Sequence, residues 1–168
     1  VYHDLLRESL IPDPFYRDNE DEALRLMENT FFYSRSFFID TALLSCPRVL
    51  LCCDGLDTLA EIRINGTSAG NADNMHRIWD FRVKDIIRKK ANSLTVYFHS
   101  PVKYIAEQFE KDPAVMGTED AMRGFPKLRK AHYMFGWDWG PRLPDAGIWK
   151  EIELLRVRKS RYKRVYIH

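Results

Sequence analysis

The densest group of chemically useful side chains lies in residues 136–141, GWDWGP, where Trp137 and Trp139 flank Asp138. On a strand the two indoles would share one face and the carboxylate would take the other. An ionised carboxylate accepts hydrogen bonds from two hydroxyls while an indole covers an apolar ring face, so the run suits sugar binding. It equally suits a tryptophan-rich core turn in which Asp138 caps backbone amides. The residue types alone do not choose between these interpretations.

A second polar group, residues 72–77 (ADNMHR), stands just before an aromatic stretch. It offers the amide of Asn74 beside a carboxylate, an imidazole and a guanidinium group, all of which bind sugar hydroxyls. Turns also collect Asn and Asp for solvation alone. Taken by itself, the run is better interpreted as a solvated turn.

The sequence carries no signature of a complete catalytic or metal centre. Its five histidines have no spacing typical of zinc ligands or of a catalytic base. There is no glycine-rich phosphate loop and no G-x-S-x-G elbow. Most other carboxylates stand among Lys and Arg or on alternating faces, as solvated side chains do. We therefore expect no catalytic residue, no metal and no cofactor in this chain.

Composition narrows the possible partners. Lys plus Arg number 26 against 24 Asp plus Glu, and a net charge of +2 cannot create the positive field that a nucleic acid requires. No apolar stretch approaches the ~20 residues of a membrane span. The 168 residues, 45% hydrophobic, suit one globular domain.

The cysteines are odd in number, which predicts no disulfide framework; they are Cys46, Cys52 and Cys53. Free thiols are more typical of a reducing cytoplasm.

Most of the chain reads as β-strand. Apolar Ala60, Ile62 and Ile64 alternate with polar neighbours, as expected when one sheet face packs inward. The following Asn65-Gly66 predicts a tight hairpin turn. Many short strands with little helix between them predict an all-β fold, a jelly-roll-like β-sandwich. The expected strands, rich in aromatic and aliphatic residues, are 31–39, 48–56, 59–64, 78–83, 93–100 and 147–157.

Helices are expected only as short accessories. The first has Asp18 or Asn19 as its cap and acidic residues in its first turn. Pro12 and Pro14 predict an irregular arm for the opening segment instead. The expected helical segments are residues 18–30, 83–90 and 102–111.

Eight groups of residues, in order, resemble the β-mannosidase group of family-two glycoside hydrolases. Together they span nearly the whole chain, and FGWDWGP is particularly specific. The segments are LIPDPFY (10–16) with DNE (18–20), GLDTLA (55–60), ING (64–66), ADNM (72–75), FHSP (98–101), RKA (129–131), FGWDWGPRLP (135–144) and AGIW (146–149).

The resemblance implies a multidomain retaining exo-enzyme that removes terminal β-D-mannose. Such an enzyme has an N-terminal, galactose-binding-domain-like jelly roll, immunoglobulin-like sandwiches and a (β/α)₈ barrel with two catalytic glutamates. A barrel needs about 250 residues, so the acid/base and nucleophile, roughly 5 to 5.5 Å apart in retaining enzymes, are not expected here. Residues 1–158 would be the jelly roll, and 159–168 would begin a linker or the next domain. The start on Val and the stop on YKRVYIH also suggest a piece of something longer.

The resemblance also implies roles for individual residues. In the family this domain sends a loop over the barrel mouth, where Asp138 would hydrogen-bond hydroxyls of the terminal sugar. Asn74 would lie in a second loop near the sugar, as in the related β-galactosidases. Trp137 and Trp139 would wall the pocket or hold the loop, and Arg142 would orient Asp138 through a charge-assisted bond.

The partners implied are a β-mannoside or related oligosaccharide and the immunoglobulin-like and barrel domains of the same polypeptide. Two alternatives remain open. The chain would be an autonomous carbohydrate-binding module, or a purely structural domain of a β-galactosidase- or β-glucuronidase-type hydrolase.

Overall fold

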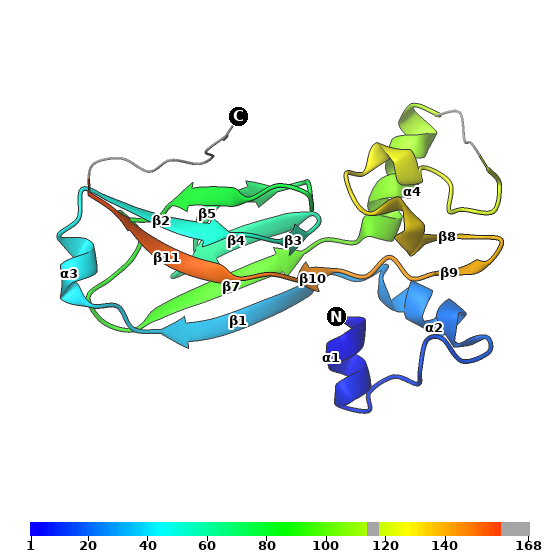
Figure 1. The fold of residues 1–168 in the computed structure, drawn as a ribbon, viewed down its shortest axis with the longest axis horizontal. Helices are drawn as coiled ribbons and strands as arrows, with labels where there is room; N and C mark the ends of the chain where they lie inside the picture. The colour runs from blue at the N-terminus through cyan, green and yellow to red at the C-terminus, as the bar shows by residue number, and fades with distance from the viewer. Residues whose placement is uncertain (114–117, 159–168) are drawn as a thin grey trace, which may run out of the picture.

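Two antiparallel sheets form most of the structure, a computed structural model that describes residues 1–113 and 118–158. They face one another as the two layers of a sandwich (Figure 1). The larger sheet has the order β1 (Phe31–Phe37), β7 (Asn92–Phe98), β4 (Ala60–Ile64) and β5 (Thr67–Ala72). The smaller has the order β11 (Ile152–Val157), β2 (Arg48–Cys53) and β6 (Trp79–Arg82). The all-β sandwich expected from the sequence is confirmed.

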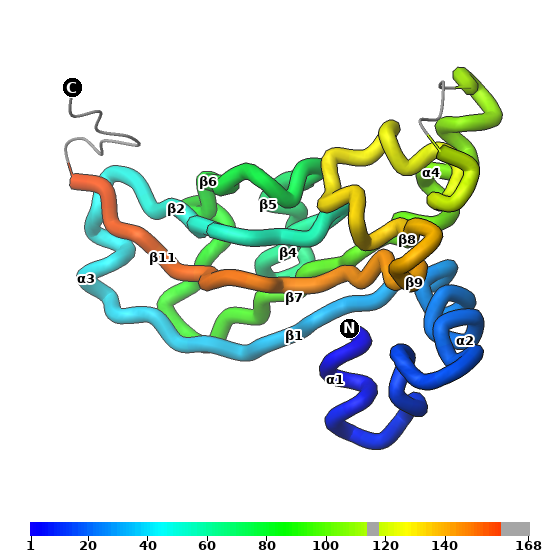
Figure 2. The backbone as a smooth tube through the Cα atoms, turned by 45° about the vertical axis from the view of Figure 1, so that its right-hand side comes forward, coloured from blue at the N-terminus to red at the C-terminus, as the bar shows by residue number. Residues whose placement is uncertain are grey.

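Two further strand pairs lie at the end of the sandwich that carries the N-terminal helices (Figures 1 and 2). They are β3 (Leu56–Asp57) with β10 (Gly147–Ile148), and β8 (Phe135–Trp137) with β9 (Gly140–Arg142). All six expected strand segments contain strands, whereas β8 and β9 were not expected. The short β8–β9 pair was missed because its aromatic and glycine residues do not alternate as those of a half-buried strand do.

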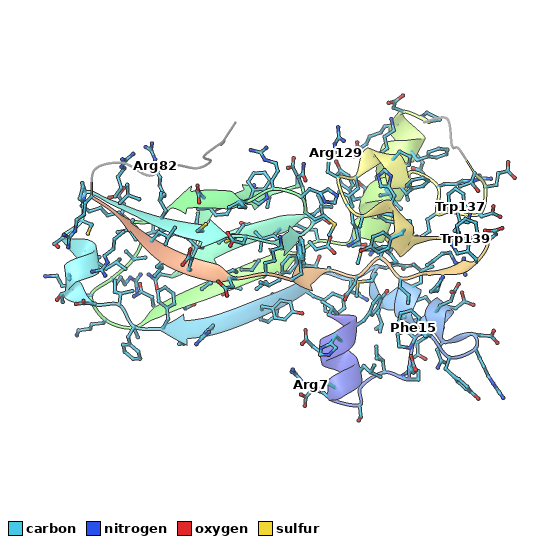
Figure 3. All side chains as sticks on the ribbon, viewed as in Figure 1. Arg7, Phe15, Arg82, Arg129, Trp137 and Trp139 are labelled. Atoms are coloured by element: carbon cyan, nitrogen blue, oxygen red, sulfur yellow. The ribbon has the colours of Figure 1, made fainter. Side chains whose placement is uncertain are left out.

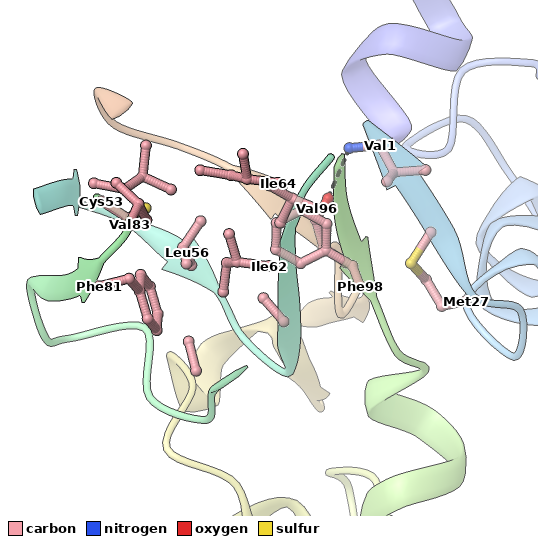
Figure 4. Close-up of a cluster of buried hydrophobic side chains, with 14 of the residues drawn as sticks. Val1, Met27, Cys53, Leu56, Ile62, Ile64, Phe81, Val83, Val96 and Phe98 are labelled. Carbon is pink, nitrogen blue, oxygen red and sulfur yellow. Dashed lines mark hydrogen bonds between the residues drawn. The ribbon is translucent and has the colours of Figure 1, made fainter. Parts of the chain in front are cut away.

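The alternation seen in the sequence of β4 places its apolar residues in the core. Ala60, Ile62 and Ile64 are at most 2% exposed, and Figure 4 shows Ile62 and Ile64 beside Val96 and Phe98 of the same sheet. The β4–β5 turn has positive φ at Asn65 (+54°) and at Gly66 (+81°), as the predicted hairpin requires.

The two long edges of the sandwich differ. On the β5–β6 side the ring of Phe81 lies against Gly70, where an added Cβ would lie 2.7 Å from the ring. On the other side, an apolar groove of about 580 Å³ lies between the edge strands β1 and β11. One edge is therefore closed by side chains and the other is open.

The helices are α1 (Tyr2–Arg7), α2 (Asn19–Leu26), α3 (Thr41–Leu44), α4 (Pro101–Lys111) and the 3₁₀ turns η1 (Phe125–Lys127) and η2 (His132–Met134). Helices α1, α2 and α4 lie at one end of the sandwich, and the short α3 lies at the opposite end (Figure 1). The predicted helices at 18–30 and 102–111 are confirmed, although Asp18 makes no side-chain capping bond. No helix of the described residues is long and apolar enough to cross a membrane.

Two predictions about local structure were wrong. Residues 83–90 form turns instead of a helix, because the Asn92 side chain accepts a hydrogen bond from the Arg88 amide (2.8 Å) and donates one to its carbonyl (2.9 Å). Such side-chain bonds compete with the helical pattern. The opening segment begins with helix α1 instead of an irregular arm, since Pro12 and Pro14 restrict only the residues around them.

The three cysteines are buried, and none of them forms a disulfide bond. Cys53 lies at the end of β2 with no exposed surface. Burial, with smaller contributions from Cys52 and nearby carboxylates, raises the pKa of the Cys53 thiol to about 12. Because the thiolate is the reactive form, Cys53 is a structural side chain and not a nucleophile. The linker expected at residues 159–168 lies outside the described residues.

Candidate functional site

The GWDWGP run forms an exposed β-hairpin. Phe135 pairs with Arg142 and Trp137 with Gly140, which leaves Asp138 and Trp139 as the turn. The side chains of Trp137 and Trp139 stand at the outer end of the molecule (Figure 3), 41% and 81% exposed. Their ring centroids lie 5.4 Å apart with 46° between the ring planes. The core-turn interpretation is therefore wrong for both tryptophans.

Asp138 is exposed at the tip of this hairpin. Its carboxylate makes no hydrogen bond or ion pair with any other described residue, so it caps none of their backbone amides. An ionised carboxylate only accepts hydrogen bonds, and no residue of 1–113 or 118–158 donates one to Asp138. The hairpin thus presents an unused acceptor between two indoles.

The root of the hairpin is anchored in a small apolar cluster beneath α4. Phe135 is fully buried there with Ile105 and Leu128. The next residue, Gly136, has φ +88°, and an added Cβ would lie 2.4 Å from Cγ of Arg142. Both the backbone conformation and the close approach of the Arg142 stem require glycine at this position.

We expect Gly136→Ala to destabilise the chain by about 1 to 3 kcal/mol, because alanine is strained at positive φ and its methyl group displaces Arg142. Urea unfolding measures this loss. The matched control is Gly140→Ala on the facing strand, where an added Cβ meets nothing within 4 Å. Equal losses for both variants would contradict the explanation.

Arg142 does not orient Asp138 as expected from the sequence. Its guanidinium donates to Glu20 Oε1 from Nε (3.0 Å) and Nη2 (2.6 Å), and Nη2 also lies 3.1 Å from Asp21 Oδ1. These bonds, above all the one to Glu20, raise the Arg142 pKa. Arg142 therefore fastens β9 to helix α2, a contact between segments more than 120 positions apart, which the sequence does not reveal.

Asn74 lies in the turn between β5 and β6, half-buried. Its Oδ1 accepts a hydrogen bond from the His76 amide (2.9 Å), and its carbonyl accepts one from Trp79 Nε1 (3.1 Å). Asn74 also forms an isolated parallel bridge with Arg129, and the Met75 amide donates to the Arg129 carbonyl (3.0 Å). The side chain thus braces a turn, and the turn supports the segment that leads into the hairpin.

The hairpin presents its carboxylate and two indoles on an exposed surface. The apolar groove between β1 and β11, and a smaller hollow of about 360 Å³ beside α4, are not lined by any of the five predicted site residues. Among residues 1–113 and 118–158 no cluster of His, Cys, Asp and Glu is arranged to hold a metal ion. The hairpin, with its carboxylate and indoles, therefore stands apart from both of these hollows.

The sequence reasoning missed two buried charged residues that contact each other close to the hairpin segment. Lys130 and Asp57 form a buried ion pair, with side chains 0% and 8% exposed. Both stand within segments that resemble the β-mannosidases, at RKA and GLDTLA, and that was the one signal available. Nothing in their local sequence indicates that they meet.

Residues 1–150 match the family model described as glycosyl hydrolase 2 galactose-binding domain-like. The chain is 34% identical over 163 residues to the β-mannosidase of Mus musculus, covering 92% of this chain and 18% of that protein. It is 32% identical to the β-mannosidase B of Thermothelomyces thermophilus over 167 residues, covering 99% of this chain and 19% of that protein. The chain thus spans about a fifth of the length of these curated relatives.

Solved structures agree. The β-D-mannosidase of Dictyoglomus thermophilum superposes with a TM-score of 0.87 at 38% identity, covering 94% of this chain and 19% of that one. The exo-chitosanase of Amycolatopsis orientalis shares the fold, with a TM-score of 0.63 at 19% identity over 93% of this chain and 16% of that one. The chain belongs to the galactose-binding-like N-terminal domains of the family-two glycoside hydrolases, and it resembles those of the β-mannosidases.

Proposed function

We propose that residues 1–158 are the N-terminal jelly-roll domain of a retaining exo-β-mannosidase and supply a substrate-recognition loop to its active site. The observation that carries the proposal is the Asp138 carboxylate, exposed at the tip of a hairpin between two indoles and without a partner among the described residues of its own domain. Asp138 would accept hydrogen bonds from hydroxyls of the terminal β-mannosyl unit. Trp137 and Trp139 would wall the pocket around that sugar.

In this proposal Arg142 and Asn74 do not contact the sugar but hold backbone segments next to the hairpin in position. Arg142 holds β9 against α2 through Glu20, and Asn74 braces the turn that supports residue 129. Residues 159–168 would lead into the next domain, and the two catalytic glutamates would come from a barrel elsewhere in the polypeptide. The domain would then act by positioning the substrate, an effect for which a misplaced contact costs on the order of 100-fold in rate.

The test is substrate choice by the full-length polypeptide that carries this domain. We expect it to hydrolyse p-nitrophenyl β-D-mannopyranoside with a kcat/KM at least ~10²-fold above those for the matching β-galactoside and β-glucuronide, because a site built to hydrogen-bond one set of hydroxyls rejects another. A preference for the galactoside or the glucuronide would overturn the assignment.

The exposed tryptophan pair also favours a second candidate, an autonomous carbohydrate-binding module. Calorimetric titration of the 168-residue chain with mannose and β-mannobiose separates the two. No heat up to millimolar sugar supports a hairpin that forms only part of a pocket. Clear binding would favour the module.

A further inference from the structure

Lys130 is a fully buried cation with two partners. Its side chain has no exposed surface, and Nζ forms an ion pair with the carboxylate of Asp57 in β3. Nζ also donates a hydrogen bond to the backbone carbonyl of Asp145 (2.6 Å). The Thr58 hydroxyl donates to the Asp57 carboxylate as well. The ammonium and the carboxylate are thus both satisfied inside the protein.

These contacts join both ends of the segment that carries the hairpin. Lys130 stands immediately before residues 131–144, and Asp145 stands immediately after them. Asp57 fixes the junction to the sandwich, because it lies in β3 and pairs with Gly147 of β10. A single ammonium therefore closes the base of the hairpin segment and ties that base to the sheets. Lys130, Asp57 and the Asp145 carbonyl are called the clamp below.

Ion pairing of this kind is not needed for stability alone. Burial lowers the pKa of Lys130 below its usual value, and the Asp57 carboxylate opposes that shift. A well-packed uncharged pair of similar volume is often as stable as a buried ion pair or more stable. What an uncharged pair lacks is the directed bond from Nζ to the Asp145 carbonyl, which fixes the exit of the segment relative to its entry.

We propose that Lys130, through Asp57 and the Asp145 carbonyl, is a positioning residue that fixes where the Trp137–Asp138–Trp139 hairpin stands over the sugar. This inference rests on the proposed function. Phe135 anchors the hairpin root in the apolar cluster and Arg142 binds its outer strand to α2. Of these three residues, only Lys130 links the start of segment 131–144 to its end.

The decisive variant, in the full-length polypeptide, is Lys130→Met with Asp57→Asn. The pair leaves no unpaired buried charge and nearly preserves volume, but it removes the bond to the Asp145 carbonyl. The matched control is Lys127→Met, three positions earlier, whose ammonium pairs with Asp112 at the surface and does not contact the clamp. If the double variant does not fold, Lys130→Leu with Asp57→Asn, which also lacks a donor for the Asp145 carbonyl, carries the same measurements.

Three quantities are measured: the midpoint of thermal unfolding, kcat/KM for a β-mannoside, and amide hydrogen exchange of residues 131–144. We expect the double variant to unfold within a few degrees of the parent, to exchange the hairpin amides at least ~10-fold faster with β1 and β7 unchanged, and to lose ~10² in kcat/KM. A purely structural role would move the unfolding midpoint and leave the other two at parent values.

Hairpin exchange and kcat/KM both equal to those of the parent would overturn the clamp. Its failure is distinguishable from failure of the proposed function. If Asp138→Ala lowers turnover while the double variant does not, the clamp alone is wrong. If Asp138→Ala leaves turnover intact, the proposed function is wrong, and hydrogen exchange still reports whether Lys130 holds the hairpin.

Discussion

Asp138→Ala in the full-length polypeptide is expected to lower kcat/KM for a β-mannoside by about 100-fold or more without changing thermal stability. The carboxylate is exposed and has no partner among the described residues, so folding loses nothing by its removal. Surface substitutions of this kind stay within about 0.5 kcal/mol. A hydrogen bond between a charged group and a sugar hydroxyl is worth about 1.5 to 3 kcal/mol, and two such bonds account for the expected loss.

Steady-state kinetics and thermal unfolding of the same preparations check this result. Asp138→Asn keeps the shape and one acceptor oxygen, and we expect it to retain more activity than alanine does. Asp85→Ala, an exposed aspartate in the turns that follow β6, is the matched control and should leave kcat/KM unchanged. Near-normal turnover of Asp138→Ala would favour the alternative of a purely structural domain, which only supports the other domains.

The second large effect concerns stability. We expect Asp57→Ala to destabilise the 168-residue chain by about 3 to 5 kcal/mol at pH 7, because it leaves the fully buried ammonium of Lys130 without its counter-charge. Urea unfolding measures this loss. The control is Asp112→Ala, which breaks the pair with Lys127. Asp112 is 81% exposed there, and a surface pair contributes about 0 to 1 kcal/mol.

The pH dependence of the Asp57→Ala variant gives an independent check. Burial lowers the pKa of Lys130 in the folded state, and the variant removes the opposing carboxylate. The folded chain then binds fewer protons at Lys130 than the unfolded chain, whose lysines titrate near 10.4. The free energy of unfolding of the variant should therefore rise with pH in the window below that value, and more steeply than that of the parent. A flat profile, or a loss equal to that of Asp112→Ala, would contradict the role of Lys130.

Local sequence was sufficient wherever neighbouring residues alone set the conformation. The alternation of β4 predicted both its strand and its buried face, and Asn65-Gly66 predicted the turn that follows it. Local sequence was insufficient at residues 83–90. Their helical pattern does not form a helix, because the Asn92 side chain makes hydrogen bonds with the Arg88 backbone. The prediction from local sequence also missed α1, because Pro12 and Pro14, which disfavour helix, lie after the end of that helix.

Some features of the candidate site also follow from the sequence alone, and others follow only from the tertiary structure. The sequence by itself predicted the all-β class and placed a carboxylate between two indoles at Trp137, Asp138 and Trp139, because strand periodicity and side-chain type are local properties. Only the tertiary structure decided that Asp138 has no partner within residues 1–113 and 118–158, that Arg142 binds Glu20, and that Lys130 meets Asp57. The last pair stands 73 positions apart in the sequence. Contacts over such distances depend on how the sheets bring segments together, and no local pattern of residues encodes them.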